Sequence, residues 1–307
     1  MCPSYERFSN SACHPPNTLL GMKFERIGNK ICLSQPKHIN HGLEELGLTE
    51  CKPSSNPLTP NLQLREASDE DHEKFKNFAV SSLARYSVKP GMSHWKEVKK
   101  TWQYLQNTKD LKFTIYPVKP TDFLSIYSNA TWGNDPDSRT SQSGYLCYLF
   151  GSFISWNSCR QRSITYSSTK AELSPLVESF HEGLWLKALI NEMWNFQIDL
   201  AAHFLDDEEL NQQLTVDSKT FIELYCTNHL IDNKGLNDKL KKFGTNSKPR
   251  HINLRTKGLR QEIKNKNIKI TLIKTQGMTA DALTKPTSIE PLRNLVRTID
   301  PTFVNQS

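Results

Sequence analysis

The 307-residue sequence has no long apolar run and no regular spacing of cysteine or histidine. No stretch approaches the ~20 apolar residues that a membrane-spanning helix needs, and the mean hydropathy is -0.58. The first residues lead into no apolar segment, so no signal peptide is expected. These absences argue against a membrane span and against secretion, and they predict an intracellular protein, either cytoplasmic or nuclear.

The seven cysteines form no Cys-x-x-Cys pair, and their number is odd. Without a secretory signal, reduced thiols are expected rather than a disulfide framework. No histidine pair accompanies a cysteine pair, which argues against a zinc site. At roughly 100–200 residues per domain, the length predicts about two domains.

The net charge is +7, and much of the positive charge is concentrated in one stretch. Residues 232–274 contain thirteen Lys or Arg against three acidic residues, so this stretch carries +10. Such a cluster is typical of a surface that binds nucleic acid backbone, although a solvated lysine-rich helix and loop would have the same composition. Seven of its residues are the expected phosphate contacts: Lys241, Lys242, Lys248, Arg250, Arg255, Lys257 and Arg260.

The hydrophobic pattern changes near residue 120. Before that point it predicts a hairpin over 21–33 and helices over 36–46, 68–87 and 93–107. After that point it predicts strands over 123–127, 145–150, 153–156, 214–217 and 268–273. Helices are expected over 169–195, 221–224, 247–264 and 280–284. This order predicts an α/β mixed sheet flanked by helices.

Three carboxylates stand at the ends of these expected elements. Glu172 lies one turn into the long helix, Asp217 ends a strand and Asp281 begins a short helix. Converging carboxylates suit Mg²⁺, and two such ions ~3.5–4 Å apart can activate water and stabilise a phosphodiester leaving group. Each residue also has a structural reading: Glu172 in a capping box with Thr169, Asp217 as a helix cap, and Asp281 as a charge at a helix N-terminus.

The short sequence motifs around these residues resemble, in order, those in the C-terminal part of the Pol polyprotein of copia-type LTR retrotransposons. Upstream of residue 119 the matching motifs are GMKFER (21–26), LSQPKHI (33–39), PLTP (57–60) and HWKEVK (94–99). Downstream they are YSNATW (127–132), SGY (143–145), ISW (154–156), SSTKAE (167–172), RHINLR (250–255) and ADALTKP (280–286). The first group resembles the end of a reverse transcriptase and the second an RNase H domain. The chain looks most like a truncated fragment from a yeast element.

The resemblance implies four regions. These are a flexible head over 1–18, a truncated reverse transcriptase C-terminal segment over 19–118, an RNase H-like domain over 119–287 and a tail over 288–307. The implied fold is α/β, an RNase H-like mixed sheet with flanking helices, preceded by a small α+β remnant of the reverse transcriptase thumb or connection. The polymerase motif YVDD is absent, so no DNA synthesis is expected.

The resemblance places the four carboxylates of an RNase H site at positions 129, 172, 217 and 281, but position 129 is asparagine. In RNase H enzymes the first aspartate contacts both metal ions. Asn129 offers one neutral carbonyl oxygen, and its amide group is a donor that cannot face a cation. Pro175 is a second departure. It either costs roughly 3 kcal/mol inside the helix that carries Glu172, or shifts the start of that helix and displaces Glu172.

These departures predict an RNase H-like domain that is catalytically impaired and binds an RNA–DNA hybrid or other nucleic acid through the basic stretch. Glu172, Asp217 and Asp281 are its expected metal ligands, and Asn129 is the degenerate position. Two alternatives stay open: an active two-metal RNase H that cuts the RNA strand, and a transposon relic without function. The expected cofactor is Mg²⁺, with Mn²⁺ as a substitute, and no membrane partner is expected.

Overall fold

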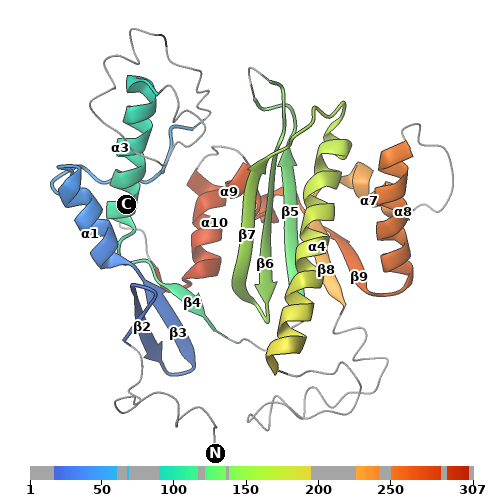
Figure 1. Cartoon of the computed structure of the whole chain (residues 1–307), viewed down its shortest axis with the longest axis horizontal. Coiled ribbons are helices and arrows are strands. Elements are labelled where there is room, and N and C mark those ends of the chain that lie inside the picture. The colour runs from blue at the N-terminus through green and yellow to red at the C-terminus, as the bar shows by residue number, and fades with distance from the viewer. Residues whose placement is uncertain are drawn as a thin grey trace, which may run out of the picture.

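The structure, a computed structural model, describes residues 17–60, 68, 90–116, 122–135, 138–194, 226–241, 250–284 and 289–303. Two sheets organise these residues, a small one near the N-terminus and a larger one with helices on both faces (Figure 1). The predicted fold class is confirmed: a mixed α/β sheet with flanking helices follows a small α+β unit. Among the described residues, no helix is both long and apolar enough to cross a membrane.

The smaller sheet joins four antiparallel strands in the order β1-β2-β3-β4. Its strands are β1 Thr18–Leu19, β2 Met22–Ile27, β3 Lys30–Ser34 and β4 Phe113–Ile115. The predicted hairpin is confirmed, and its turn uses Gly28 at a φ of 59°, a left-handed conformation that glycine adopts without strain. Two predicted helices are also present, α1 Pro36–Glu45 and α3 Met92–Asn107, and they pack against each other.

The larger sheet has the strand order β7-β6-β5-β8-β9. Its strands are β5 Leu124–Thr131, β6 Gln142–Leu149, β7 Ser152–Arg160, β8 Thr227–Ile231 and β9 Ile268–Leu272. Strands β5, β6 and β7 are antiparallel neighbours, whereas β8 runs parallel to β5 and β9 runs parallel to β8. The carboxyl ends of β5, β8 and β9 therefore share one edge of the sheet, the upper edge in Figure 1.

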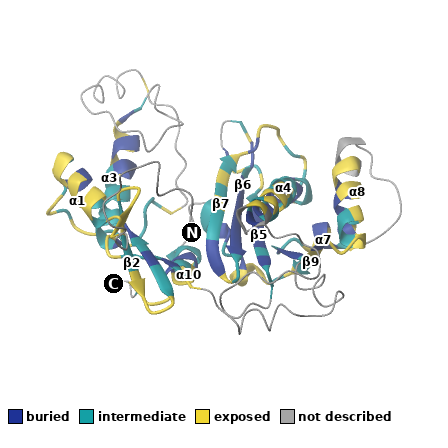
Figure 2. Ribbon diagram, turned by 60° about the horizontal axis from the view of Figure 1, so that its bottom comes forward, coloured by how far each residue is buried: buried dark blue, intermediate teal, exposed yellow. Residues whose placement is uncertain are grey.

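Helices cover both faces of the larger sheet. They are α4 Ser168–Trp194, α7 Lys234–Lys241, α8 Arg250–Lys264, α9 Asp281–Thr284 and α10 Ile289–Ile299. Alternate residues of β6 divide the core, because successive side chains of a strand point to opposite faces. Tyr145 and Cys147 pack with Leu186 of α4, while Leu146 and Tyr148 pack with Leu295 of α10. The central strands are accordingly the most buried part of the ribbon in Figure 2.

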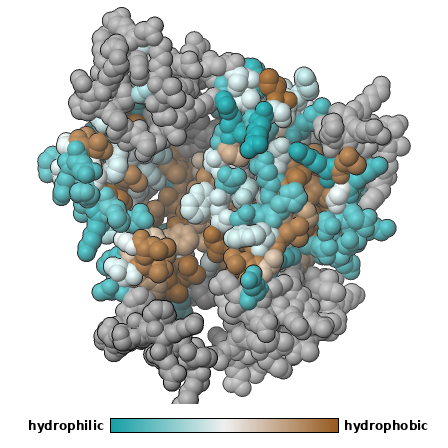
Figure 3. Space-filling model, in the orientation of Figure 1, coloured by the Kyte–Doolittle hydropathy of each residue, from teal (hydrophilic) through white to brown (hydrophobic). Residues whose placement is uncertain are grey.

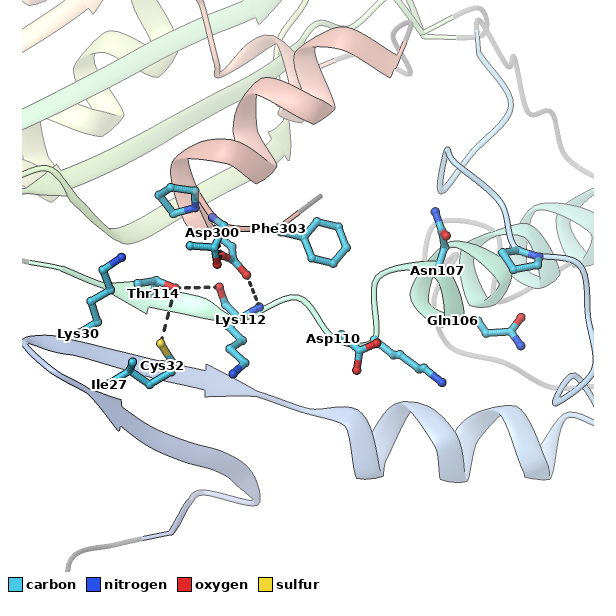
Figure 4. A pocket seen from close by; sticks show the side chains of 14 residues that line it. Ile27, Lys30, Cys32, Gln106, Asn107, Asp110, Lys112, Thr114, Asp300 and Phe303 are labelled. Carbon is cyan, nitrogen blue, oxygen red and sulfur yellow. Dashed lines mark hydrogen bonds between the residues drawn. The ribbon is translucent and has the colours of Figure 1, made fainter. Parts of the chain in front are cut away.

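Helix α10 contacts both sheets, β4 of the smaller one and β7 of the larger one. Apolar residues gather over α10 and β4, between the sheets, in Figure 3. Beside them lies a cavity of about 520 Å³ lined by residues of the small sheet, of α3 and of the segment after α10. There the backbone N–H of Lys112 donates to Asp300 Oδ2 at 3.0 Å, and Cys32 Sγ lies 3.9 Å from Thr114 Oγ1 (Figure 4). This cavity contains none of the predicted site residues.

Two elements differ from the sequence-based expectation. Strand β8 was not predicted, although it is the strand beside β5, and the region predicted as a tail contains helix α10. The helix expected over 68–87, the strand over 214–217 and the helix over 221–224 lie outside the described residues. The predicted domain boundaries stay a prediction.

Pro175 lies inside α4, which begins at Ser168 and so keeps Glu172 in its second turn. Proline has no N–H, so the carbonyl of Ala171, four residues earlier, has no donor within the helix. The side chain of Gln161 supplies one: its Nε2 donates to Ala171 O at 2.9 Å and to Ser143 Oγ at 2.9 Å. Both Ala171 and Gln161 are buried. The helix therefore continues through Pro175 without displacing Glu172.

Gln161→Ala is expected to lower the free energy of unfolding by about 1–3 kcal/mol, because it leaves the buried Ala171 carbonyl without a donor. In a Pro175→Ala background the N–H of residue 175 can reach the same carbonyl, so the cost of Gln161→Ala should fall by about 1 kcal/mol. Urea denaturation of the four chains measures this coupling. Equal costs in both backgrounds would show that Gln161 does not compensate for Pro175.

Candidate functional site

Three of the four expected site positions meet at the carboxyl end of β5 (Figure 1). Asn129 lies on β5, Glu172 on α4 and Asp281 at the start of α9, and their exposed fractions are 4%, 8% and 6%. The amide of Asn129 donates hydrogen bonds to Asp281 Oδ1 and, at 3.2 Å, to Thr284 Oγ1. The sequence therefore identified three residues that the fold brings together.

A glycine on β6 lets α9 approach Asn129. Gly144 is the register partner of Asn129, and a Cβ at this position would lie 2.9 Å from Leu283 Cβ and from Thr284 Cγ2. The neighbouring strand β7 also contacts α9, because its Ser158 Oγ donates to Leu283 O at 2.6 Å. The glycine of the SGY motif therefore makes room for α9, the helix that carries Asp281.

Glu172 is tied to the sheet. Its Oε2 accepts a hydrogen bond from the backbone N–H of Ala130 at 3.0 Å, next to Asn129 on β5. Helix α4 begins at Ser168, and Ser167 Oγ accepts from the N–H of Lys170 at 3.3 Å. The capping-box reading of Thr169 and Glu172 is therefore wrong, because Thr169 lies inside the helix rather than at its N-cap.

The third expected carboxylate, Asp217, lies outside the described residues. The structure brings a different aspartate to the same edge. Asp232 directly follows the last residue of β8. Tyr127 of β5 and Leu230 of β8 are register partners in this parallel pair. Two positions further along each strand, Asn129 and Asp232 therefore stand level with each other. Neighbouring strands lie about 4.8 Å apart, so Asp232 belongs to the edge that holds Asn129. The sequence feature that could have identified Asp232 is the Asp-Asn pair at 232–233, which follows a short strand and precedes a helix. The asparagine of this pair caps helix α7, because Asn233 Oδ1 accepts from Leu236 N at 2.9 Å.

Asp135, in the loop after β5, serves that loop rather than the site. Its Oδ1 accepts from the N–H of Ser138 at 2.9 Å, and its Oδ2 lies 3.7 Å from Arg160 Nη1. Asp137 lies outside the described residues. Asp135 is therefore held within its own loop and does not replace the carboxylate that position 129 lacks.

The donor set at this edge does not fit a pair of Mg²⁺ ions. A cation shared between positions 129 and 281 needs oxygen acceptors from both, but the Asn129 amide points its N–H groups at Asp281. Among the described residues, no three His, Cys, Asp or Glu side chains are grouped so that they could hold a metal ion. The amide instead satisfies the Asp281 carboxylate directly, in the way that a bound cation would.

Helix α8 includes the positions of four of the seven predicted basic residues, and much of its surface is exposed (Figure 2). Arg255 and Lys257 are exposed, and so is Lys241 at the end of α7. Arg260 has a structural contact as well, because its Nε donates to the carbonyl of Lys239 at 3.1 Å and so caps the last turn of α7. Lys242 and Lys248 lie outside the described residues, as does the side chain of Arg250.

The basic helices lie next to the helix that carries Glu172. The amino end of α7 touches the first turn of α4, where a Cβ on Gly235 would lie 3.1 Å from Thr169 Oγ1. Helix α8 packs against α4, α7 and β9. Burial raises the pKa of Glu178 on α4, and the positive charge of Arg255 on α8 opposes that rise. The acidic edge and the basic surface are therefore neighbours across the amino half of α4.

Comparisons with known proteins give the chain its relatives. No protein-family model matches it. It is 27% identical over 299 residues to the retrovirus-related Pol polyprotein from transposon TNT 1-94 of Nicotiana tabacum, covering 88% of this chain and 20% of that one. It is 25% identical over 314 residues to the transposon Ty1-GR3 Gag-Pol polyprotein of Saccharomyces cerevisiae, covering 89% and 16%. The chain is a homologue of transposon Pol polyproteins.

This homologue of Pol polyproteins spans about a fifth of the length of the TNT 1-94 relative. It is also 40% identical over 110 residues to the secreted RxLR effector protein 161 of Plasmopara viticola, covering 35% of this chain and 75% of that one. Among solved structures it is similar to LC11-RNase H1 in complex with an RNA/DNA hybrid, with 10% identity, a TM-score of 0.34, and coverage of 52% of this chain and 93% of that one. The predicted resemblance to retrotransposon Pol polyproteins is confirmed, and its copia-type detail stays a prediction.

Proposed function

We propose that this chain contains an RNase H-like domain of a transposon Pol polyprotein that binds an RNA–DNA hybrid and hydrolyses it poorly or not at all. The observation that carries the proposal is the hydrogen bond from the Asn129 amide to Asp281. Both residues stand at the edge where the sequence motifs place an RNase H site. An amide in this position binds the neighbouring carboxylate and supplies no anionic ligand.

The proposed binding surface combines charge and position. Exposed cations on α7 and α8 can contact phosphates, and phosphate contacts dominate the affinity of proteins for nucleic acid. The acidic edge lies beside them across α4. A hybrid bound along α8 would therefore place one strand close to Glu172 and Asp281, whether or not the strand is cut.

Hybrid affinity is expected to fall steeply with salt, because each neutralised phosphate releases counterions. Four phosphate contacts give a slope of about −3.6, which lowers affinity on the order of 100-fold between 50 and 200 mM salt. Lys257→Glu on α8 should weaken binding and reduce the slope by about 1. Lys96→Glu makes the same charge change at an exposed position on α3 and should leave the slope unchanged. Fluorescence anisotropy with a labelled blunt hybrid measures both.

A flat affinity over this salt range would contradict the proposed surface. Equal slopes for Lys257→Glu, Lys96→Glu and the parent chain would move the contacts away from α8. A chain without cooperative unfolding and without hybrid binding would favour the reading as a relic.

An active two-metal RNase H is the second candidate, and one observation favours it. Glu172, Asp281 and Asp232 all stand at the carboxyl edge of the parallel strands. In this case Mg²⁺, or Mn²⁺ in its place, would be the cofactor. Robust cleavage of the RNA strand by the unmodified chain in Mg²⁺ would establish this function and refute the impairment.

A further inference from the structure

Three large side chains are exposed together beside the acidic edge. Trp132 is 53% exposed, Ile164 56% and Tyr166 85%. Trp132 follows the end of β5, and the other two lie in the segment between β7 and α4. The indole Nε1 of Trp132 donates to the carbonyl of Thr165 at 2.8 Å, which holds the two segments together. We call the two rings of Trp132 and Tyr166, together with Ile164, the aromatic patch.

The aromatic patch adjoins both the candidate site and several cations. Trp132 stands two residues after Ala130, whose N–H binds Glu172, and Tyr166 directly precedes the serine that caps α4. Lys170 Nζ lies 5.3 Å from the centre of the Tyr166 ring. Arg139 and Arg162 are exposed in the two loops that carry the patch.

We infer that the aromatic patch is a stacking site for an unpaired base of the bound nucleic acid strand, an inference that rests on the proposed function. A base inside a duplex already stacks on its neighbours, whereas an unpaired base has free faces that an exposed ring can cover. The exposed Tyr166 ring offers such a face beside Lys170, a cation that can contact the adjoining phosphate. The combination of rings and cations complements a single-stranded nucleic acid better than an apolar protein surface, which would leave the cations unpaired.

The test compares three hybrids of equal duplex length by fluorescence anisotropy at one salt concentration. One is blunt, one carries a single-stranded flank of four nucleotides, and one carries a flank of four abasic nucleotides with the same phosphates. The parent chain should bind the flank with bases about tenfold more tightly than the abasic flank, since an abasic nucleotide keeps the phosphate and cannot stack on the ring. A 2-aminopurine at the first unpaired position should be quenched on binding.

Substitutions at Tyr166 should separate stacking from charge. Tyr166→Ala should abolish both the tenfold preference and the quenching, while its affinity for the blunt hybrid stays at the parent value. Tyr166→Phe keeps a ring and should keep both effects. Trp185→Ala removes another exposed ring, 56% exposed on α4 and outside the patch, and should behave as the parent.

The outcomes separate this inference from the proposed function. Binding of the blunt hybrid with no preference for bases over abasic flanks would overturn the stacking site and leave the proposed function standing. An equal loss on all three ligands in Tyr166→Ala would also overturn it. Failure of the parent to bind any of the three would overturn the proposed function itself, and the stacking site with it.

Discussion

Asn129→Asp is expected to raise Mg²⁺-dependent cleavage of the RNA strand by at least about tenfold over the parent chain. The substitution replaces an amide that donates to Asp281 with a carboxylate that can join Asp281, Glu172 and Asp232 around a cation. Anionic ligands offset the mutual repulsion of closely spaced divalent ions, and ligand changes near a metal alter its affinity by roughly 10- to 100-fold. A hybrid with a labelled RNA strand, incubated with Mg²⁺ or Mn²⁺, measures the change. Mn²⁺ is tested beside Mg²⁺ because both ions take carboxylate and carbonyl oxygens, which are the ligands that this edge offers.

The same substitution should destabilise the chain when no metal is present. It removes a hydrogen bond to a buried carboxylate and places a second carboxylate against it, at a cost of about 3 kcal/mol. Millimolar Mg²⁺ should recover much of this loss by binding the folded state, and should leave the parent unchanged. Urea denaturation with and without Mg²⁺ measures both effects.

Asn228→Asp is the matched control. Asn228 Nδ2 donates to Asp122 Oδ2 at 2.9 Å, so the control also sets an aspartate against an aspartate, away from the carboxyl edge of β5. It should destabilise the chain and give no cleavage. If the Asn129→Asp variant stayed inactive in both metal ions, the explanation of the impairment by Asn129 would be wrong.

The elements with a clear hydrophobic period could be predicted from the sequence. The hairpin around Gly28, helix α3, strands β5, β6, β7 and β9, and the long helix α4 all follow local patterns. Glu172 and Asp281 were found because they stand at the ends of such elements. Asn129 was recognised as a departure only through the resemblance to Pol polyproteins, and its hydrogen bond to Asp281 could only come from the fold.

Strand β8 shows what the pattern could not supply. Its sequence, TNHLI, places Asn228 and His229 in the buried strand beside β5, where an apolar run would be expected. Partners from distant parts of the sequence offset the cost of burying these polar side chains. Asn228 forms hydrogen bonds with Asp122 and Thr271, and His229 Nδ1 lies 3.5 Å from Ser179 Oγ. Burial lowers the pKa of His229 to about 3, so the ring stays neutral. Because these partners are remote in sequence, the strand was missed, and Asp232 with it.

Helix α10 was missed for a different reason. Its Leu295 packs in the core with Leu146 and Tyr148. Leu292, Leu295, Val296 and Ile299 have the spacing of one helical face, which the sequence already contained. The compensation of Pro175 by Gln161, by contrast, joins positions fourteen residues apart and depends on the path of the chain between β7 and α4.

Gly144→Ala is expected to lower the free energy of unfolding by about 1–3 kcal/mol and to loosen α9 from the sheet. The added methyl would lie 2.9 Å from Leu283 Cβ and Thr284 Cγ2, and such overpacking forces neighbouring atoms to shift. Both contacts belong to α9, so the shift should separate Asp281 from Asn129. Amide hydrogen exchange should become faster in 281–284.

Gly258→Ala is the opposite case of the same substitution. Gly258 lies inside helix α8, and a Cβ there would meet nothing within 4 Å. Alanine restricts the unfolded chain more than glycine and favours the helix, so this variant should be more stable than the parent by about 0.5–1 kcal/mol. Urea denaturation of both variants gives the two signs in one experiment. If Gly144→Ala were neutral or stabilising, the close approach of α9 to β6 would not hold, and neither would the contact between Asn129 and Asp281 that depends on it.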